Sequence, residues 1–239
     1  MSGRKRFFTD AVTGEDAVLD GDEFVHAVTV QRVAEGDEIC LLDGSGREFT
    51  ATVTKVEKKR LTARISSVAD CDCEPRAKIY LLVGALKGDK TELVVQKACE
   101  LGVGKIGVFS SEYCSAYLNA NKLERLNKVA REATKQCMRA RAPEIEYFDD
   151  LASALESARD CDNALFACEF ASSSEADLSA LSGTTAIVVG SEGGFSEAEF
   201  ALAPRLGFAA VHLGKRILRA ETAAIALTAI VAHSLGEMQ

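Results

Sequence analysis

The sequence predicts a two-part protein, in which a small β-rich region precedes an α/β domain with a parallel sheet. Residues 1–70 contain short strand-like segments separated by turn residues. Beyond residue 76, short apolar runs alternate with segments of helical periodicity, which is typical of a parallel sheet covered on both faces. Residues 70–77 lack periodicity and contain a proline, so we place the two domains at residues 1–70 and 76–239.

The strands of the N-terminal region are indicated by composition and alternation. Residues 39–42 form an apolar run that ends at the turn signal D-G-S-G of residues 43–46. Residues 49–56 are rich in Thr and Val, and residues 61–65 alternate apolar and polar side chains. The K-K-R of residues 58–60 falls between these two segments and predicts a turn. Together these features predict a small β-barrel.

The second domain has the alternating pattern of an α/β fold. Strands are predicted at residues 79–83, 106–109, 165–168, 186–189 and 211–213. Helices are predicted at residues 91–101, 121–141 and 222–235, with Gly102 as a C-cap and Thr222 as an N-cap. A further helix follows Ser196, which can form a capping box with Glu199.

The charge of the chain is unevenly distributed. The net charge is −8, but residues 76–143 contain 13 Lys and Arg against 6 Asp and Glu. Such a basic segment can bind a polyanion locally, although a solvated helix face would have the same composition. No apolar run has the length of a membrane span, and the first residues lack the apolar core of a signal peptide. We therefore expect no membrane partner.

The eight cysteines are scattered without the spacing of a disulfide framework. We interpret them as reduced thiols of a cytoplasmic protein. Cys71 and Cys73 are too close for ordinary zinc-site spacing and have no neighbouring His, so we expect no metal.

Two segments near the C-terminus carry the chemistry. The first loop, residues 190–195 (G-S-E-G-G-F), follows a buried strand, and its paired glycines permit close approach of a ligand to the backbone. The second loop, residues 213–219 (L-G-K-R-I-L-R), mixes cations with apolar residues just before a hydrophobic helix. Neither loop has the G-x-G-x-x-G or P-loop pattern, so ordinary NAD or ATP binding is not indicated.

The order and spacing of these loops resemble a known family. The V-V-G-S-E-G-G-F-S-x-x-E of residues 188–199 and the L-G-K-R-I-L-R-A-E-T-A of residues 213–223 resemble the SPOUT methyltransferases and, more narrowly, the RsmE-type 16S rRNA (uracil-N3)-methyltransferases. Further similar segments are residues 4–8, His26, residues 32–37, Lys87, residues 96–103, residues 131–137, Arg139 and Pro143. Ser191 stands where the family usually has Pro, and Thr29 and Gln31 also depart from its pattern.

The resemblance implies an α/β SPOUT fold with a C-terminal trefoil knot, plus a small N-terminal PUA-like β-barrel domain. The two loops and the turn after residues 165–168 would form the knot and hold S-adenosyl-L-methionine. The expected partner is 16S rRNA or the small ribosomal subunit, and the expected assembly is a homodimer with active sites at the subunit interface.

The resemblance also implies roles for individual residues. The expected cofactor-binding residues are Gly190, Glu192, Gly194, Leu213, Gly214, Ile217, Leu218, Thr222 and Ala223. The expected RNA-binding residues are Arg4, Arg6, His26, Arg32, Lys87, Arg131, Lys135 and Arg139. The expected catalytic residues are Arg219, Arg131 and Glu221.

The reaction implied is methyl transfer to the N3 atom of uracil, which must lose its proton. An arginine such as Arg219 or Arg131 can favour the N3 anion. Glu132, Glu192 or Glu221 could accept the proton, and Glu221 could instead brace the loop through an ion pair. His212, on a short apolar strand, is more typical of a core residue.

Three other functions are compatible with parts of the sequence. One is another SPOUT reaction, such as ribose 2′-O-methylation. The second is an RNA-binding ribosome-assembly protein without catalysis. The third is a nucleotide-binding oxidoreductase, which a cofactor-binding measurement would separate from a methyltransferase.

Overall fold

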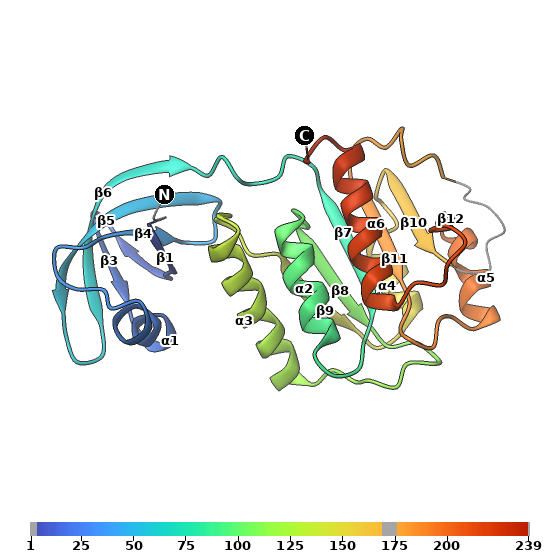
Figure 1. The fold of residues 1–239 in the computed structure, drawn as a ribbon, viewed down its shortest axis with the longest axis horizontal. Helices are drawn as coiled ribbons and strands as arrows, with labels where there is room; N and C mark the ends of the chain where they lie inside the picture. The colour runs from blue at the N-terminus through green and yellow to red at the C-terminus, as the bar shows by residue number, and fades with distance from the viewer. Residues whose placement is uncertain (1–3, 169–175, 239) are drawn as a thin grey trace. The chain divides into compact units, whose positions relative to one another are not determined.

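A computed structural model describes residues 4–168 and 176–238 (Figure 1). The chain divides into two compact units. The N-terminal unit comprises Met1–Glu74 and Thr134–Ala142, and the C-terminal unit comprises Pro75–Ala133 and Pro143–Gln239. Within the described residues, no helix is both long enough and apolar enough to cross a membrane.

The N-terminal unit is built on one mixed six-stranded sheet. Its strands are β1 (Lys5–Phe8), β2 (Ala11–Thr13), β3 (Asp16–Leu19), β4 (Glu38–Leu42), β5 (Arg47–Val56) and β6 (Leu61–Asp70). They are arranged in the order β1-β4-β5-β6-β3-β2, and only the β1–β4 pair is parallel. A short helix α1 (Gly21–Val25) continues into a π-helical turn η1 (His26–Val30).

The strands predicted in this unit are confirmed, as is the turn between β5 and β6. Alternation explains the core, because Leu61 and Ala63 of β6 are buried while Thr62 and Arg64 are not. The sheet has β1 and β2 as its edges, so its hydrogen bonds do not close the barrel that the sequence suggested.

The segment after helix α3 (Ala120–Gln136) corrects the predicted extent of that helix. The sequence predicted a helix up to Arg141, but α3 ends at Gln136 and Met138 adopts a positive φ of 67°. The following backbone is held instead by Glu74, which accepts hydrogen bonds from the N–H groups of Ala140 (2.6 Å) and Arg141 (2.7 Å). Residues 134–142 therefore pack with the N-terminal unit, although the sequence assigned them to the second domain.

The C-terminal unit contains a six-stranded sheet in which all strands are parallel. Its strands are β7 (Ile79–Gly84), β8 (Lys105–Phe109), β9 (Glu144–Phe148), β10 (Asn163–Ala167), β11 (Thr185–Val189) and β12 (Ala209–Val211), in the order β12-β10-β11-β7-β8-β9. Its other helices are α2 (Lys90–Glu100), α4 (Leu151–Ser157), α5 (Glu197–Arg205) and α6 (Ala220–Ser234). The parallel sheet predicted from the apolar runs is confirmed, whereas β9 and α4 were not predicted.

Helices cover both faces of this sheet, which is why its central strands are apolar throughout. Leu81 and Val83 of β7 pack in a cluster with residues of α2, α3 and α6. Tyr80 and Leu82 point to the opposite face and pack in a cluster with residues of α4 and α5. Figure 1 shows α2 and α6 in front of the sheet.

Of the two helices that follow the loops, α5 begins as predicted and α6 begins earlier than predicted. The capping box of Ser196 and Glu199 at the start of α5 is confirmed. Helix α6 begins at Ala220 with Arg219 at the N-cap position, so Thr222 lies inside the first turn and does not cap the helix as predicted. The extra turn places the start of α6 directly after the second loop.

Candidate functional site

A cavity of about 530 Å³ lies at the carboxyl ends of β10, β11 and β12. Its wall is formed mainly by the residues that follow these strands, among them both loops predicted from the sequence. The lining residues are Lys90, Ala167, Cys168, Val189, Gly190, Ser191, Glu192, Gly194, Phe195, Val211, His212, Leu213, Gly214, Lys215, Arg216, Ile217, Leu218, Arg219, Ala220 and Ala223. The volume lies in the range of pockets that hold a small molecule or cofactor.

The first loop forms a tight turn at the end of β11. The N–H of Gly194 donates a 3.0 Å hydrogen bond to the carbonyl of Ser191, and Gly194 adopts a φ of 69°, which a residue with a side chain rarely does. Gly84 at the end of β7 packs directly beneath the turn. A Cβ atom on Gly84 would lie 2.5 Å from the backbone nitrogen of Ser191. Two glycines thus fix the path of the loop along the cavity.

The carboxylate of Glu192 ties the first loop to the start of α2. Its Oε1 accepts hydrogen bonds from the backbone N–H of Lys87 (3.1 Å) and from Nζ of Lys90 (3.0 Å). Burial disfavours the ionised carboxylate, but these hydrogen bonds outweigh burial and lower the pKa of Glu192. The same hydrogen bond from Lys90, opposed by desolvation, raises the pKa of Lys90. Both groups are therefore charged at neutral pH.

Lys90 also faces a second carboxylate. Its Nζ lies 3.6 Å from Oε2 of Glu221, in the first turn of α6. That oxygen is buried and has no hydrogen-bond partner. Lys90 thus balances two carboxylates, one from each loop region.

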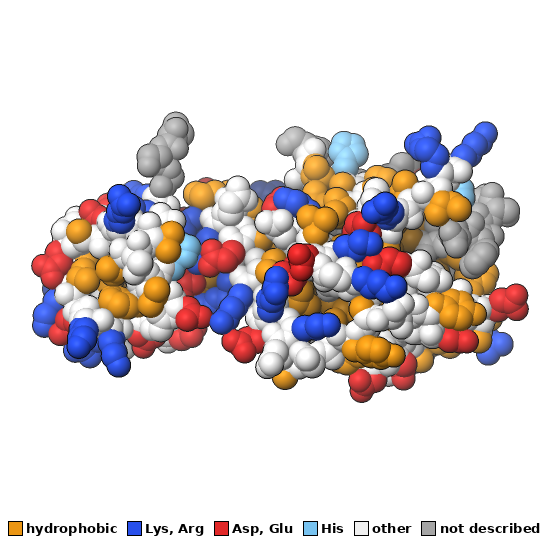
Figure 2. All heavy atoms as spheres, turned by 60° about the horizontal axis from the view of Figure 1, so that its bottom comes forward, with side chains coloured by type: hydrophobic (Ala, Val, Ile, Leu, Met, Phe, Trp, Pro, Cys, Tyr) orange, Lys and Arg blue, Asp and Glu red, His pale blue; other side chains and the backbone are white. Residues whose placement is uncertain are grey.

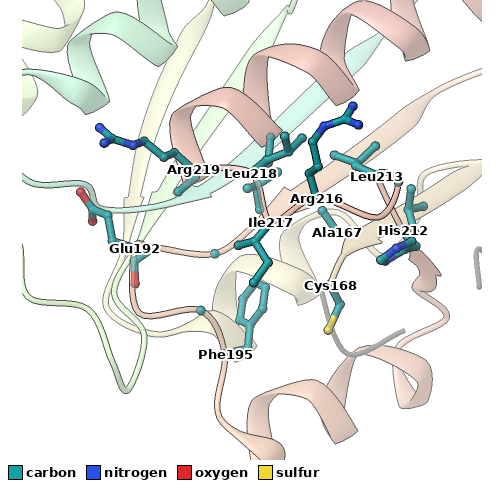
Figure 3. Close-up of a pocket in the computed structure, with 18 of the residues that line it drawn as sticks. Ala167, Cys168, Glu192, Phe195, His212, Leu213, Arg216, Ile217, Leu218 and Arg219 are labelled. Atoms are coloured by element: carbon teal, nitrogen blue, oxygen red, sulfur yellow. The ribbon is translucent and has the colours of Figure 1, made fainter. Parts of the chain in front are cut away.

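The second loop provides apolar and cationic groups. Ile217 is 85% exposed although it is apolar, and Figure 3 shows its side chain directed toward Phe195 across the pocket. Arg219 lies on the same side of the pocket as Glu192 in that view, and Arg216 points away from both. The cavity therefore combines an uncovered apolar side chain with cations near its rim, which suits a ligand with both apolar and polar parts.

Comparison with known proteins gives consistent matches. Residues 73–232 match the RNA methyltransferase domain family and residues 19–66 match the RNA methyltransferase PUA domain family. The ribosomal RNA small subunit methyltransferase E of Bacillus subtilis is 32% identical over 226 residues, which is 89% of this chain and 88% of that protein. Its counterpart from Mesomycoplasma hyopneumoniae is 36% identical and covers 93% of this chain and 96% of its own length. This chain belongs to the ribosomal RNA small subunit methyltransferase E family.

Solved structures of the family share the fold. The ribosomal RNA small subunit methyltransferase E of Neisseria gonorrhoeae, bound to S-adenosyl methionine, has a TM-score of 0.88 at 32% identity and covers 98% of both chains. A methyltransferase from Legionella pneumophila in complex with the same cofactor has a TM-score of 0.88 at 31% identity, over 97% of this chain and 98% of its own. The α/β fold with an N-terminal PUA-like domain is thereby confirmed.

Most residues expected to bind the cofactor in this family member line the cavity. Only Thr222, of the nine, is absent from the wall, because it lies in the first turn of α6 and is exposed. Arg219 lines the cavity. Glu221 is not a lining residue, but its Oε2 lies 3.6 Å from Nζ of Lys90, which is one. Arg131 lies in α3 and is not among the lining residues.

Several lining residues were not expected from the sequence. Lys90 is the most informative, because it is a cation at the helix start that follows the strand β7. The rule that ligands bind at the carboxyl ends of parallel strands could have found it. His212 and Cys168 also line the cavity, although His212 was interpreted as a core residue. Among the described residues, no cluster of three potential metal ligands occurs.

The residues expected to bind RNA fall into two groups. Three are buried and engaged within the N-terminal unit. Arg6 pairs with Glu48, Lys135 with Glu23 and Arg139 with Glu74. Arg4, Arg32 and Lys87 are exposed, and Arg131 and His26 are half-buried. The ring of His26 lies near Phe7, and its Nε2 is 3.3 Å from Nε2 of Gln31.

Proposed function

We propose that this protein transfers a methyl group from S-adenosyl-L-methionine to N3 of a uridine in 16S rRNA. The cavity between the two loops carries the proposal, because its wall contains the loop residues that the family resemblance assigns to the cofactor. When bound, the cofactor supplies a methyl group on a sulfonium. The cytoplasm, where ribosomes are assembled, is the compartment that this substrate implies.

The residues of the cavity fit such a cofactor. Leu213, Ile217 and Leu218 offer apolar side chains and backbone groups to the adenine, and the exposure of Ile217 is explained if a flat ring covers it. Gly190 and Gly194 leave room for the ligand beside the first loop, and Gly214, with a φ of 81°, does so in the second.

The chemistry requires removal of the N3 proton before nitrogen attacks the methyl carbon. Arg219 is proposed to stabilise the N3 anion, because it lies at the rim of the cavity and its guanidinium stays charged. Glu221 is proposed as the proton acceptor rather than Glu192. Both hydrogen bonds of Glu192 hold the first loop, whereas Oε2 of Glu221 has no hydrogen-bond partner. We keep Arg131 and Glu132 as a second pair of candidates, which would act if α3 contributes to the site of a partner subunit.

Two finer features belong to the same proposal. A trefoil knot would form from the two loops and the turn after β10, and that turn includes residues 169–175, which lie outside the described residues. A homodimer would place the active sites at its two-fold interface. Exposed basic residues of both units, Arg4, Arg32 and Lys87, together with His26, would hold the RNA mainly through its phosphates.

The test is a methylation assay on small ribosomal subunits from cells that lack the corresponding enzyme. Digestion to nucleosides and mass spectrometry should reveal 3-methyluridine that depends on both protein and cofactor. A product methylated at the ribose 2′-oxygen, or no product from a protein that binds S-adenosyl-L-methionine, would contradict the proposal. Gly194→Val provides the negative control, because a β-branched residue is strained at the φ of Gly194. Its fold is checked by circular dichroism.

A further inference from the structure

Two exposed tyrosines lie on the loop between β8 and α3, residues 110–119, close to the first loop. Tyr113 is 51% exposed and Tyr117 is 69% exposed, and no other Tyr or Phe among the residues that the structure describes is exposed. The chain contains no Trp. An aromatic ring left in solvent beside a proposed RNA site calls for an explanation, because aromatic rings are the side chains on which bases stack.

Tyr113 sits directly against the first loop. A Cβ atom on Gly193 would lie 2.6 Å from Cβ of Tyr113 and 2.6 Å from its carbonyl oxygen. Gly193 lies between Glu192 and Gly194, which both line the cavity. The close packing of the two backbones is possible only because Gly193 has no side chain, and it fixes the starting point of the Tyr113 side chain beside the cavity wall.

The residues on either side of Tyr113 are anchored. The N–H of Glu112 donates a 2.9 Å hydrogen bond to Oε1 of Glu199, the residue whose other oxygen completes the capping box of α5. The thiol of Cys114 donates to the carbonyl of Ala85, 3.1 Å away, just after β7. The backbone at Tyr113 is thus fixed on both sides while the ring remains exposed, which is the arrangement of a pre-organised binding surface.

The surroundings also suit RNA. Figure 2, in which the lower side of Figure 1 comes forward, shows Lys and Arg side chains interspersed with hydrophobic and acidic ones on the C-terminal unit. Lys122, at the start of α3, reaches back to this loop and donates a 2.8 Å hydrogen bond to the carbonyl of Tyr117. Cations that meet phosphates and a ring that meets a base are the two components of single-stranded RNA recognition.

We propose that Tyr113 is the stacking platform for the uracil that is methylated. This inference rests on the proposed function and specifies how that site holds its substrate. A uracil turned out of its stack needs a surface for one face, while its N3 edge must stay open toward the methyl donor. Stacking on a tyrosine ring provides this, because it uses the face of the base and leaves the edge free.

Kinetics with purified variants test the inference. Tyr113→Ala should raise KM for the RNA roughly 5- to 150-fold, because one base–aromatic stack contributes about 1–3 kcal/mol to binding. Tyr113→Phe should stay within about twofold of the wild type, whereas Tyr113→Leu, which keeps bulk without aromaticity, should behave like Tyr113→Ala. The dissociation constant for S-adenosyl-L-methionine should be unchanged in all three. Tyr117→Ala is the matched control on the same loop and should leave KM unchanged.

Photocrosslinking gives an independent readout. RNA with 5-iodouridine at the methylated position should crosslink to Tyr113, and RNA with the label at a neighbouring uridine should not. The inference is overturned if Tyr113→Leu matches Tyr113→Phe, if cofactor affinity falls together with RNA affinity, or if only the neighbouring position crosslinks. If the wild-type protein itself makes no 3-methyluridine, the proposed function has failed, and that result is distinct from a failure of Tyr113 alone.

Discussion

The ammonium of Lys90 donates a 3.0 Å hydrogen bond to Glu192 and thereby fastens the first loop to the start of α2. The lowered pKa of Glu192 means that its contribution to stability is complete above its ordinary value of 4.5 and is lost as the pH falls through the lower value of the folded protein. The raised pKa of Lys90 means that its contribution is complete below 10.5 and is lost only at higher pH. The pair is therefore intact over the whole neutral range.

Replacement of Glu192 by Gln should lower the Tm at pH 7 and weaken binding of S-adenosyl-L-methionine, because the first loop loses its charged anchor. The difference in Tm between the variant and the wild type should shrink as the pH falls below 4.5 and through the lowered pKa of Glu192, because the protonated carboxyl group, like the amide, carries no charge. Thermal melts at several pH values check this. A difference in Tm that stays constant over the acidic range in which Glu192 becomes protonated would show that the ion pair is not its cause.

Gly84→Ala should displace the first loop, which forms part of the cofactor site. The added methyl group would lie 2.5 Å from the backbone nitrogen of Ser191, so the first loop must move. We expect a loss of about 1–3 kcal/mol in the free energy of unfolding and weaker cofactor binding. Denaturant titration and calorimetry measure the two effects.

Gly104→Ala is the matched control for that substitution. Its added methyl group would come no closer than 3.9 Å to any neighbour, and its φ is not in the left-handed region. The free energy of unfolding should change by less than about 1 kcal/mol. Equal effects at Gly84 and Gly104 would refute the steric explanation.

Glu74→Ala should destabilise the N-terminal unit by about 3–5 kcal/mol, because it removes the carboxylate of a buried ion pair with Arg139. The side chain of Arg139 is only 4% exposed, and Glu74 also accepts the two backbone hydrogen bonds that hold residues 134–142. Glu156→Ala breaks an exposed pair between Glu156 of α4 and Arg159, which follows that helix, and should cost under about 1 kcal/mol. Denaturant unfolding should therefore separate the two variants clearly.

The cysteines should differ strongly in reactivity. Burial raises the pKa of Cys40 to about 11 and, with a hydrogen bond to Glu48, that of Cys71 to about 11. At pH 8 only about one molecule in a thousand would carry the thiolate at either position, and alkylation requires the thiolate. Iodoacetamide at pH 8 should therefore modify the exposed Cys73 and spare the other two, as peptide mass spectrometry can show. Rapid modification of Cys40 in the folded protein would contradict the raised pKa of its thiol.

Local sequence patterns were sufficient for much of the fold. The apolar run at β7 predicts a buried parallel strand because a strand covered by helices on both faces of the sheet has apolar side chains on both faces. The capping box of Ser196 and Glu199 marks the start of a helix through side-chain hydrogen bonds alone. The end of α3 could not be predicted in this way. Its periodicity continues past Gln136, but a distant glutamate, Glu74, offers the backbone a better set of hydrogen bonds.

In the site, too, some residues could be predicted from local sequence patterns and others could not. The loop residues were predictable because glycines and charges next to a buried strand are unusual, and eight of the nine expected cofactor residues line the cavity. Lys90 was missed although it follows a predicted parallel strand, and Tyr113 was not found because its place beside the first loop depends on which strands become neighbours. The burial of Arg6 and Arg139 was also hidden, since a basic residue in a sequence does not reveal whether it faces solvent or an internal glutamate.

The N-terminal unit is discontinuous in sequence, and this has a consequence for biosynthesis. Its buried Arg6 donates hydrogen bonds to the carbonyls of Met138 (3.2 Å) and Arg139 (2.9 Å), and these residues are translated long after the last strand of its sheet. Until residue 142 has left the ribosome, the nascent chain therefore holds a sheet whose packing is incomplete and a guanidinium that lacks two of its acceptors. A gene fragment that stops after β6 encodes all six strands yet omits the segment that completes their packing.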